Sequence, residues 1–169
     1  MADLPRVGDL ELEEDLKFQR GEWIAQRIGW GVMALVVIAA LLGLFGGGPL
    51  SRATVSDDQG LLVVDYNRFL RHHKADTLRL KLTPDHGANE VHLRVSADYL
   101  DALEIQQITP EPVRMTLEEG WQVLVFRVSQ PGSPVAVTVH FEPDDFGSLT
   151  AQMRLNDQSP IVFEQFIYP

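Results

Sequence analysis

The apolar residues near the N-terminus form one long run, residues 28–51, in which no side chain is charged. An α-helix rises 1.5 Å per residue, so residues 28–45 alone span about 27 Å, close to the ~30 Å hydrocarbon thickness of a bilayer. We therefore predict one transmembrane helix within residues 23–46. Residues 1–22 are predicted to form an acidic N-terminal segment that is partly helical.

From residue 61 onward the apolar positions recur every second residue, as in strands with one buried face. Turns rich in Gly, Pro and Asp separate these alternating segments. The pattern predicts an antiparallel β-sandwich of immunoglobulin-like size at residues 61–169, with seven to eight strands. A helical turn is expected at residues 96–103. The candidate strands are 61–66, 77–82, 90–96, 113–117, 121–128, 135–142, 149–155 and 161–168.

Between the helix and the first predicted strand lies a segment rich in glycine and polar residues, GGGPLSRATVSDDQG. Glycine has little helical preference and Pro49 cannot continue helical hydrogen bonding, so the helix is expected to end at the glycines. We predict that residues 47–60 form a flexible linker between the helix and the β-domain.

Aromatic and basic residues mark the N-terminal end of the predicted span. Trp23 and Trp30 bracket Arg27. This arrangement is typical of headgroup depth, where indole rings settle and an arginine side chain extends toward water. We predict that these three residues lie at the membrane interface. Nothing inside the span is ionisable, which disfavours proton or ion transfer by this helix.

Small residues recur every four positions along the apolar run, at Ala39, Gly43 and Gly47. At this spacing they share one stripe of a helix and let another helix approach closely. We predict a helix-packing face here, used either by a second copy of the chain or by a multi-pass membrane protein.

Basic residues near the span set its predicted orientation. Lys17, Arg20 and Arg27 precede the span and Arg52 and Arg68 follow it. Basic residues favour the cytoplasmic side, and long soluble domains cross membranes largely regardless of their charge. We therefore predict an inner-membrane protein of a Gram-negative bacterium with a cytoplasmic N-terminus and a periplasmic β-domain.

A cleaved signal peptide is the competing interpretation of the apolar run. Such a peptide has a short basic lead, an apolar region of about 7–15 residues and an A-x-A-like cleavage site. Here the lead is long and acidic, the apolar run is longer, and the sequence GGGPLSRA contains no such site. An uncleaved signal anchor is therefore favoured.

The composition excludes several classes of function. The formal net charge is −10, and the basic patch needed to bind a phosphate backbone is missing, so nucleic acid is not a predicted partner. The chain has no cysteine, which excludes disulfides, thiolate metal sites and cysteine nucleophiles. The sequence also lacks a G-x-S-x-G elbow, an S-x-x-K motif and a phosphate-binding loop, so we predict that the protein is not an enzyme.

The histidines offer the only metal chemistry. No short ligand spacing is present, so no metal or cofactor is predicted. The best local cluster is His72 and His73 with Asp76, and it is kept as a candidate metal or proton-sensitive site. Met115 and Met153 are alternative thioether ligands, but both fall on inward-facing positions and are expected to lie in the core.

The last predicted strand, residues 161–168, is apolar on both faces and contains three aromatic residues, Phe163, Phe166 and Tyr168. One interpretation is that this segment is a strand of the sandwich and that its aromatic side chains pack against the other strands. The alternative is that one face forms a patch for another subunit, or that the strand lies at a sheet edge protected by a partner.

One N-terminal helix followed by an exported immunoglobulin-like domain resembles the plan of copper-delivery assembly factors and of small accessory subunits of membrane complexes. The cysteines with which such factors bind copper are absent here. We predict a non-enzymatic accessory or scaffold subunit that associates through its helix with a membrane partner or with itself, and presents a periplasmic interaction domain. The alternative is a membrane-anchored periplasmic ligand-binding or metal-binding module.

Overall fold

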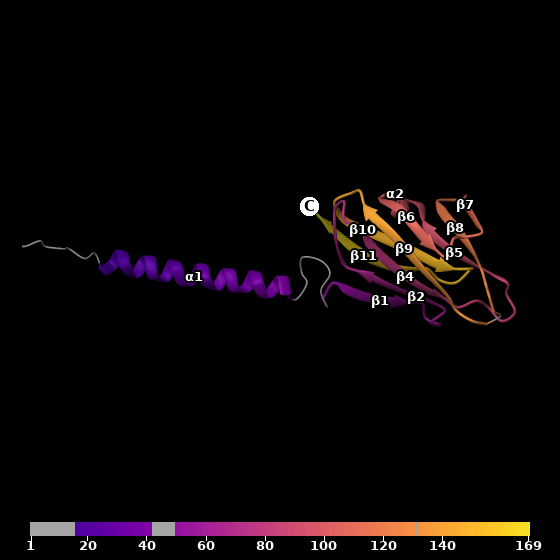
Figure 1. Cartoon of the computed structure of the whole chain (residues 1–169), viewed down its shortest axis with the longest axis horizontal. Helices are drawn as coiled ribbons and strands as arrows, with labels where there is room; N and C mark the ends of the chain where they lie inside the picture. Colours follow the sequence, from indigo (N-terminus) through magenta and orange to yellow (C-terminus); the bar gives the residue numbers. More distant parts are fainter. Residues whose placement is uncertain (1–15, 42–49, 131) are drawn as a thin grey trace, which may run out of the picture. The chain divides into compact units, whose positions relative to one another are not determined.

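The structure of the chain is a computed structural model that describes residues 16–41, 50–130 and 132–169. The chain forms two compact units, whose boundary falls between Ile38 and Ala39. Figure 1 shows an N-terminal helix and a β-domain. An N-terminal apolar helix followed by an all-β domain of two packed sheets confirms the predicted fold class.

Helix α1 spans Leu16–Leu41 and begins inside the segment predicted to be partly helical. Within the described residues, one helix is long and apolar enough to cross a membrane, Gly21–Leu41, with a mean hydropathy of 1.8. Its 21 residues extend about 32 Å along the axis. The single apolar helix near the N-terminus is therefore confirmed. Its predicted continuation to residue 46 lies outside the described residues.

The side chains predicted for the membrane interface lie along one part of α1. The Arg27 guanidinium stacks on the Trp23 ring, 3.7 Å from its centroid, as residues four apart on a helix are placed to do. Trp30 is exposed. Of the predicted packing stripe, Ala39 lies in the last turn of α1, whereas Gly43 and Gly47 lie outside the described residues. That stripe stays a prediction.

The described part of the β-domain contains eleven strands in two sheets. One sheet has the order β1-β2-β4-β9-β6 and the other the order β3-β11-β10-β5-β8-β7. Both are visible in Figure 1. A short helix, α2 (Ala97–Asp101), forms the predicted helical turn. The strands are β1 Arg52–Ser56, β2 Leu62–Asn67, β3 Phe69–Arg71, β4 Asp76–Leu82, β5 Glu90–Ser96, β6 Leu103–Thr109, β7 Arg114–Glu118, β8 Trp121–Arg127, β9 Val135–Pro143, β10 Gly147–Leu155 and β11 Ile161–Tyr168.

The core lies between the two sheets and is formed by the alternating apolar positions. In β4, Leu78, Leu80 and Leu82 are buried, while Arg79 and Lys81 face solvent. Strand β8 is buried on both faces from Val123 to Phe126, and it lies between β5 and β7 in the sheet. Burying a Leu or Val side chain contributes about 1.5–3 kcal/mol, so this alternation is the main source of the domain's stability.

The predicted flexible linker at residues 47–60 is wrong for its second half. Arg52–Ser56 is strand β1, which pairs with β2 in an antiparallel register. Ser51 is fully buried, and its carbonyl accepts a 2.6 Å hydrogen bond from the Arg68 amide. The alternation in RATVS is too short and too polar to stand out in the sequence, and the neighbouring strand supplies the hydrogen bonds that order it.

The predicted count of seven to eight strands is low because three strands have weak sequence signals. These are β1, the three-residue β3, and β6, whose register shifts between Ile105 and Gln107 and so breaks the alternation. The sheets are also not wholly antiparallel, since β3 pairs with β11 in parallel. Met153 is buried as predicted. Met115 lies on the inward side of β7, opposite the buried Leu124, but β7 is an edge strand and Met115 is 50% exposed, so its predicted place in the core is wrong.

A chain of polar side chains crosses the interior from one sheet to the other. The Tyr99 hydroxyl donates to Gln165 Oε1 at 2.7 Å, and Gln165 Nε2 donates to the Asn67 carbonyl at 2.8 Å. Asn67 Nδ2 in turn donates to both carboxylate oxygens of Asp76, at 2.8 and 3.0 Å. Tyr99 and Gln165 are buried, so these hydrogen bonds replace the water that both side chains lose on folding.

Substitution of Tyr99 with Phe is expected to lower the free energy of unfolding by about 1–3 kcal/mol, because the buried Gln165 oxygen loses its donor. Urea denaturation of the full chain in detergent micelles measures this loss. Tyr66→Phe is the matched control and is expected to stay within about 0.5 kcal/mol of wild type, since the Tyr66 hydroxyl has no hydrogen bond to the described residues. Equal losses in both variants would contradict the role of this hydrogen bond.

The buried Tyr99 hydroxyl also makes the free energy of unfolding depend on pH in the alkaline range. Burial, and to a lesser extent the charge of Asp76, raises the pKa of Tyr99 above its usual value of 10.0. Above pH 10 the unfolded chain releases the phenolic proton of Tyr99, whereas the folded chain keeps it. The contribution of Tyr99 to the free energy of unfolding is therefore complete below pH 10 and declines by about 1.4 kcal/mol per pH unit above it. The stability advantage of wild type over Tyr99→Phe is expected to be smaller at pH 11 than at pH 9. An unchanged difference would show that Tyr99 ionises equally in both states.

Candidate functional site

One end of the sandwich brings together segments that are far apart in the sequence. It contains Ser51, where the chain enters the β-domain just before β1. It also contains the end of β2, the turn between β3 and β4, the turn between β9 and β10, and the end of β11. Backbone hydrogen bonds join these segments: the His72 amide donates to the Tyr168 carbonyl at 2.9 Å, and the Phe166 amide donates to the Arg68 carbonyl at 2.7 Å. We refer to this region as the entry end.

A groove of about 810 Å³ opens at the entry end, lined by residues of β1, β2, β3, β4 and β11. Four cationic side chains line it, Arg52, Arg71, Lys74 and Arg79, and all four residues are exposed. They are four of the ten Lys and Arg residues that follow the helix. We call this surface the cationic groove. It is a local concentration of positive charge on a chain whose net charge is −10.

The charges of the cationic groove are only partly neutralised within the described part of the domain. Two carboxylates also line it, so the cations outnumber them by four to two; Asp65 accepts a hydrogen bond from Thr54, and Asp76 accepts two from Asn67. Among the described residues, none of the four cations lies within 4.0 Å of a carboxylate oxygen. Guanidinium and ammonium groups in this arrangement can bind carboxylate or phosphate oxygens, the guanidinium groups in a bidentate manner.

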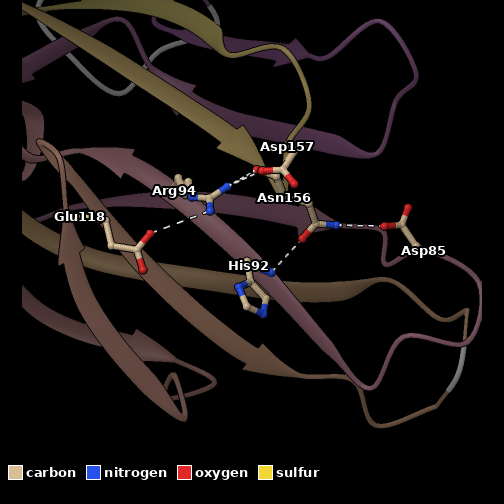
Figure 2. A network of polar contacts seen from close by, with 6 residues as sticks. All are labelled: Asp85, His92, Arg94, Glu118, Asn156 and Asp157. Carbon is tan, nitrogen blue, oxygen red and sulfur yellow. Dashed lines mark hydrogen bonds and ion pairs between the residues drawn. The ribbon is translucent and has the colours of Figure 1, made fainter.

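Arg94 shows the contrasting case of a cation with its partners in place (Figure 2). Its Nη1 donates to Asp157 Oδ1 at 2.9 Å and to the Asn156 carbonyl at 2.7 Å, and its Nη2 lies 3.9 Å from Glu118 Oε2. The Asn156 side chain accepts from the His92 amide and donates to Asp85. This network fastens the turn between β10 and β11 to β5, so we assign it a structural role.

The predicted cluster of His72, His73 and Asp76 is only partly correct. Asp76 is turned toward Asn67 and does not join the histidines. Asp144, from the turn after β9, takes its place: His73 Nδ1 lies 3.9 Å from Asp144 Oδ1, and His72 Nε2 lies 3.2 Å from the Asp144 carbonyl oxygen. Strand β4 pairs with β9, which brings the turn before β4 beside the turn after β9. A residue about 70 positions away gives no local sequence signal.

The three C-terminal aromatic residues have different environments. Phe163 is buried and packs on Tyr66 with ring centroids 4.2 Å apart and on Tyr99 at 6.1 Å, so its prediction as part of a partner surface is wrong. Inward positions of β11 point into the core, and Phe163 occupies one of them. Phe166 points outward and is 48% exposed. Tyr168 lines the cationic groove.

No known protein family and no curated protein matches the sequence. Among solved structures, it is similar to a non-cellulosomal cohesin from the hyperthermophilic archaeon Archaeoglobus fulgidus, at 12% identity and a TM-score of 0.39, over 70% of this chain and 91% of that one. It is also similar to the cupredoxin domain of amoB from Nitrosocaldus yellowstonii, at 10% identity and a TM-score of 0.31, over 65% of this chain and 57% of that one.

Proposed function

We propose that this chain is a non-enzymatic bitopic membrane protein, an accessory or scaffold subunit whose β-sandwich binds an acidic segment of a partner protein in the cationic groove. In this proposal α1 anchors the chain in the inner membrane as an uncleaved signal anchor, with the N-terminus in the cytoplasm and the β-domain in the periplasm. The observation that carries the proposal is a groove lined by four cations and two carboxylates, in which no cation forms an ion pair with the described residues, on a chain whose net charge is −10.

Electrostatics favours an anionic occupant of the groove. The four cations repel one another, and the two carboxylates beside them offset only part of their positive charge. A partner carboxylate lowers this repulsion when it binds, and the positive field of the groove accelerates its approach. The remaining acidic surface repels anionic partners, which restricts their binding to this place.

The other side chains of the groove favour a polypeptide as the occupant. Tyr66 and Phe69 lie among the cations and offer aromatic contact area, while Thr54 and Thr77 offer hydroxyl groups. Aromatic and arginine side chains are enriched in protein interfaces, because they combine apolar area with hydrogen bonding. A segment with acidic and apolar residues matches this combination.

The helix supplies the second part of the proposed association. The apolar side chains of α1 are exposed around its circumference, as expected of a helix surrounded by lipid or by other helices. We propose that Trp23, Arg27 and Trp30 lie at the inner interface and that the small-residue stripe of Ala39, Gly43 and Gly47 packs against a multi-pass protein or a second copy of the chain. Membrane anchoring holds the groove close to its partner and raises the effective concentration of both.

Reversal of two groove charges, Arg52→Glu with Arg79→Glu, is expected to reduce recovery of the partner at least tenfold, because each reversal replaces attraction by repulsion. The tagged full chain is extracted from its native membranes in mild detergent, and co-purifying proteins are quantified by mass spectrometry. Raising the salt concentration is expected to release the same partner from the wild-type chain.

Arg114→Glu with Arg127→Glu is the matched control, since both arginines are exposed on β7 and β8 and lie outside the groove. This variant is expected to retain the partner within about twofold. Thermal denaturation verifies that both double variants are folded. Equal recovery with both double variants, or purification of a free monomer from the wild-type membranes, would contradict the proposal.

A further inference from the structure

The entry end carries a second cluster, separate from the cationic groove, in which three metal-binding side chains converge. His72, His73 and Asp144 each offer one ligand atom, and these atoms lie within 4.8 Å of one another. We propose that these three residues bind one divalent transition-metal ion of the zinc class. Imidazole nitrogen and carboxylate oxygen bind Zn²⁺ at about 2.0–2.2 Å, and three protein ligands with an open fourth position form a common zinc geometry.

Backbone contacts hold all three residues in place. The His72 amide donates to the Tyr168 carbonyl at 2.9 Å, the His73 amide to the Pro143 carbonyl at 3.1 Å, and the Asp144 amide to the Ala102 carbonyl at 3.0 Å. The two turns are thus fastened to each other and to neighbouring strands before any ion binds. Rotation of the exposed His73 and Asp144 side chains can then bring the ligand atoms, which lie within 4.8 Å of one another, toward the separation of about 3.3 Å that tetrahedral zinc requires.

One ring nitrogen of His72 is left free to bind a metal ion. Its Nε2 lies 3.2 Å from the Asp144 carbonyl oxygen, and a carbonyl oxygen only accepts hydrogen bonds. This contact places the proton on Nε2 and leaves the lone pair on Nδ1, an arrangement that metal-binding histidines commonly use. The ring also stacks on Phe146 with centroids 4.0 Å apart, which restricts its rotation.

His73 has a backbone conformation that calls for an explanation. Its φ is +51°, in the left-handed region that most residues other than glycine avoid. This conformation places the two adjacent imidazoles side by side, with ring centroids 3.7 Å apart, and directs His73 Nδ1 to within 3.9 Å of Asp144 Oδ1. In a regular strand, consecutive side chains point to opposite faces, and the two rings would not meet.

The side chains of His73 and Asp144 are 61% and 69% exposed, so the open coordination position faces solvent. A water molecule or a ligand from another protein can occupy it. The chain therefore offers a metal-bridged contact beside the cationic groove. This inference stands on its own residues and does not require the partner proposed above.

The test is titration of the full chain with Zn²⁺ in detergent micelles, after purification with a histidine-free tag and removal of metal with a chelator. Isothermal titration calorimetry and metal analysis of the dialysed protein measure affinity and stoichiometry. Wild type is expected to bind one Zn²⁺ per chain. His73→Asn and Asp144→Asn are each expected to weaken binding at least tenfold, since each loses a direct ligand. Asparagine is chosen for His73 because it tolerates positive φ.

The matched controls are His86→Asn and Asp145→Asn. His86 is an exposed histidine in the turn before β5, and Asp145 is the exposed carboxylate next to Asp144 in the same turn. Both controls are expected to bind Zn²⁺ within twofold of wild type. Thermal denaturation in the presence of chelator identifies any variant that fails to fold. The absence of binding by wild type at 100 µM Zn²⁺, or equal weakening by the ligand and control substitutions, would overturn the proposal.

Discussion

The hydrogen-bonded chain of Tyr99, Gln165, Asn67 and Asp76 is the interaction on which the entry end depends. Hydrophobic contact is non-directional, so apolar packing constrains the relative position of two sheets less specifically than hydrogen bonds do. A buried polar chain that reaches from β11 to β2 and β4 is directional, and it fixes the position of the last strand relative to the opposite sheet. The carboxylate at its far end, Asp76, lies in the wall of the cationic groove.

Two kinds of chemistry occur side by side at the entry end. Arg71 ends β3, and His72, His73 and Lys74 follow it in the turn that leads to β4. Arg71 and Lys74 line the groove, whereas the two imidazoles reach Asp144 on the turn after β9. The left-handed conformation of His73 separates the two sets. This segment thus contributes to the proposed anion-binding surface and to the proposed metal site.

The sequence predicts the parts of this structure that depend on local periodicity. The alternation of Leu78, Leu80 and Leu82 identifies a strand with one buried face, and the uncharged run after Ile28 identifies the apolar helix. Strand β6 was missed because its bulge removes the alternation, and β1 because its order comes from pairing with β2. The composition of these segments, taken alone, matches that of a loop.

The candidate sites were harder to predict because their residues come together through strand pairing. His72 and His73 were recognisable as a pair, but their third member is Asp144 and not Asp76, which follows from the pairing of β4 with β9. The cations of the groove lie on three strands and one turn, so no segment of the sequence shows them as a patch. Phe163 and Phe166 differ only in which side of β11 they occupy, and the register decides which one is buried.

The central claim is that the chain spans the membrane once, with its β-domain on the outer side. The chain has no cysteine, so a single introduced cysteine reports its own location. Asp58→Cys, in the exposed turn after β1, and Glu22→Cys, in α1, are each expressed in intact cells with a permeable outer membrane and treated with a membrane-impermeant maleimide. The account predicts labelling of Asp58→Cys in intact cells and of Glu22→Cys only after lysis. Labelling of Glu22→Cys alone in intact cells, or release of the β-domain into the soluble fraction without α1, would contradict it.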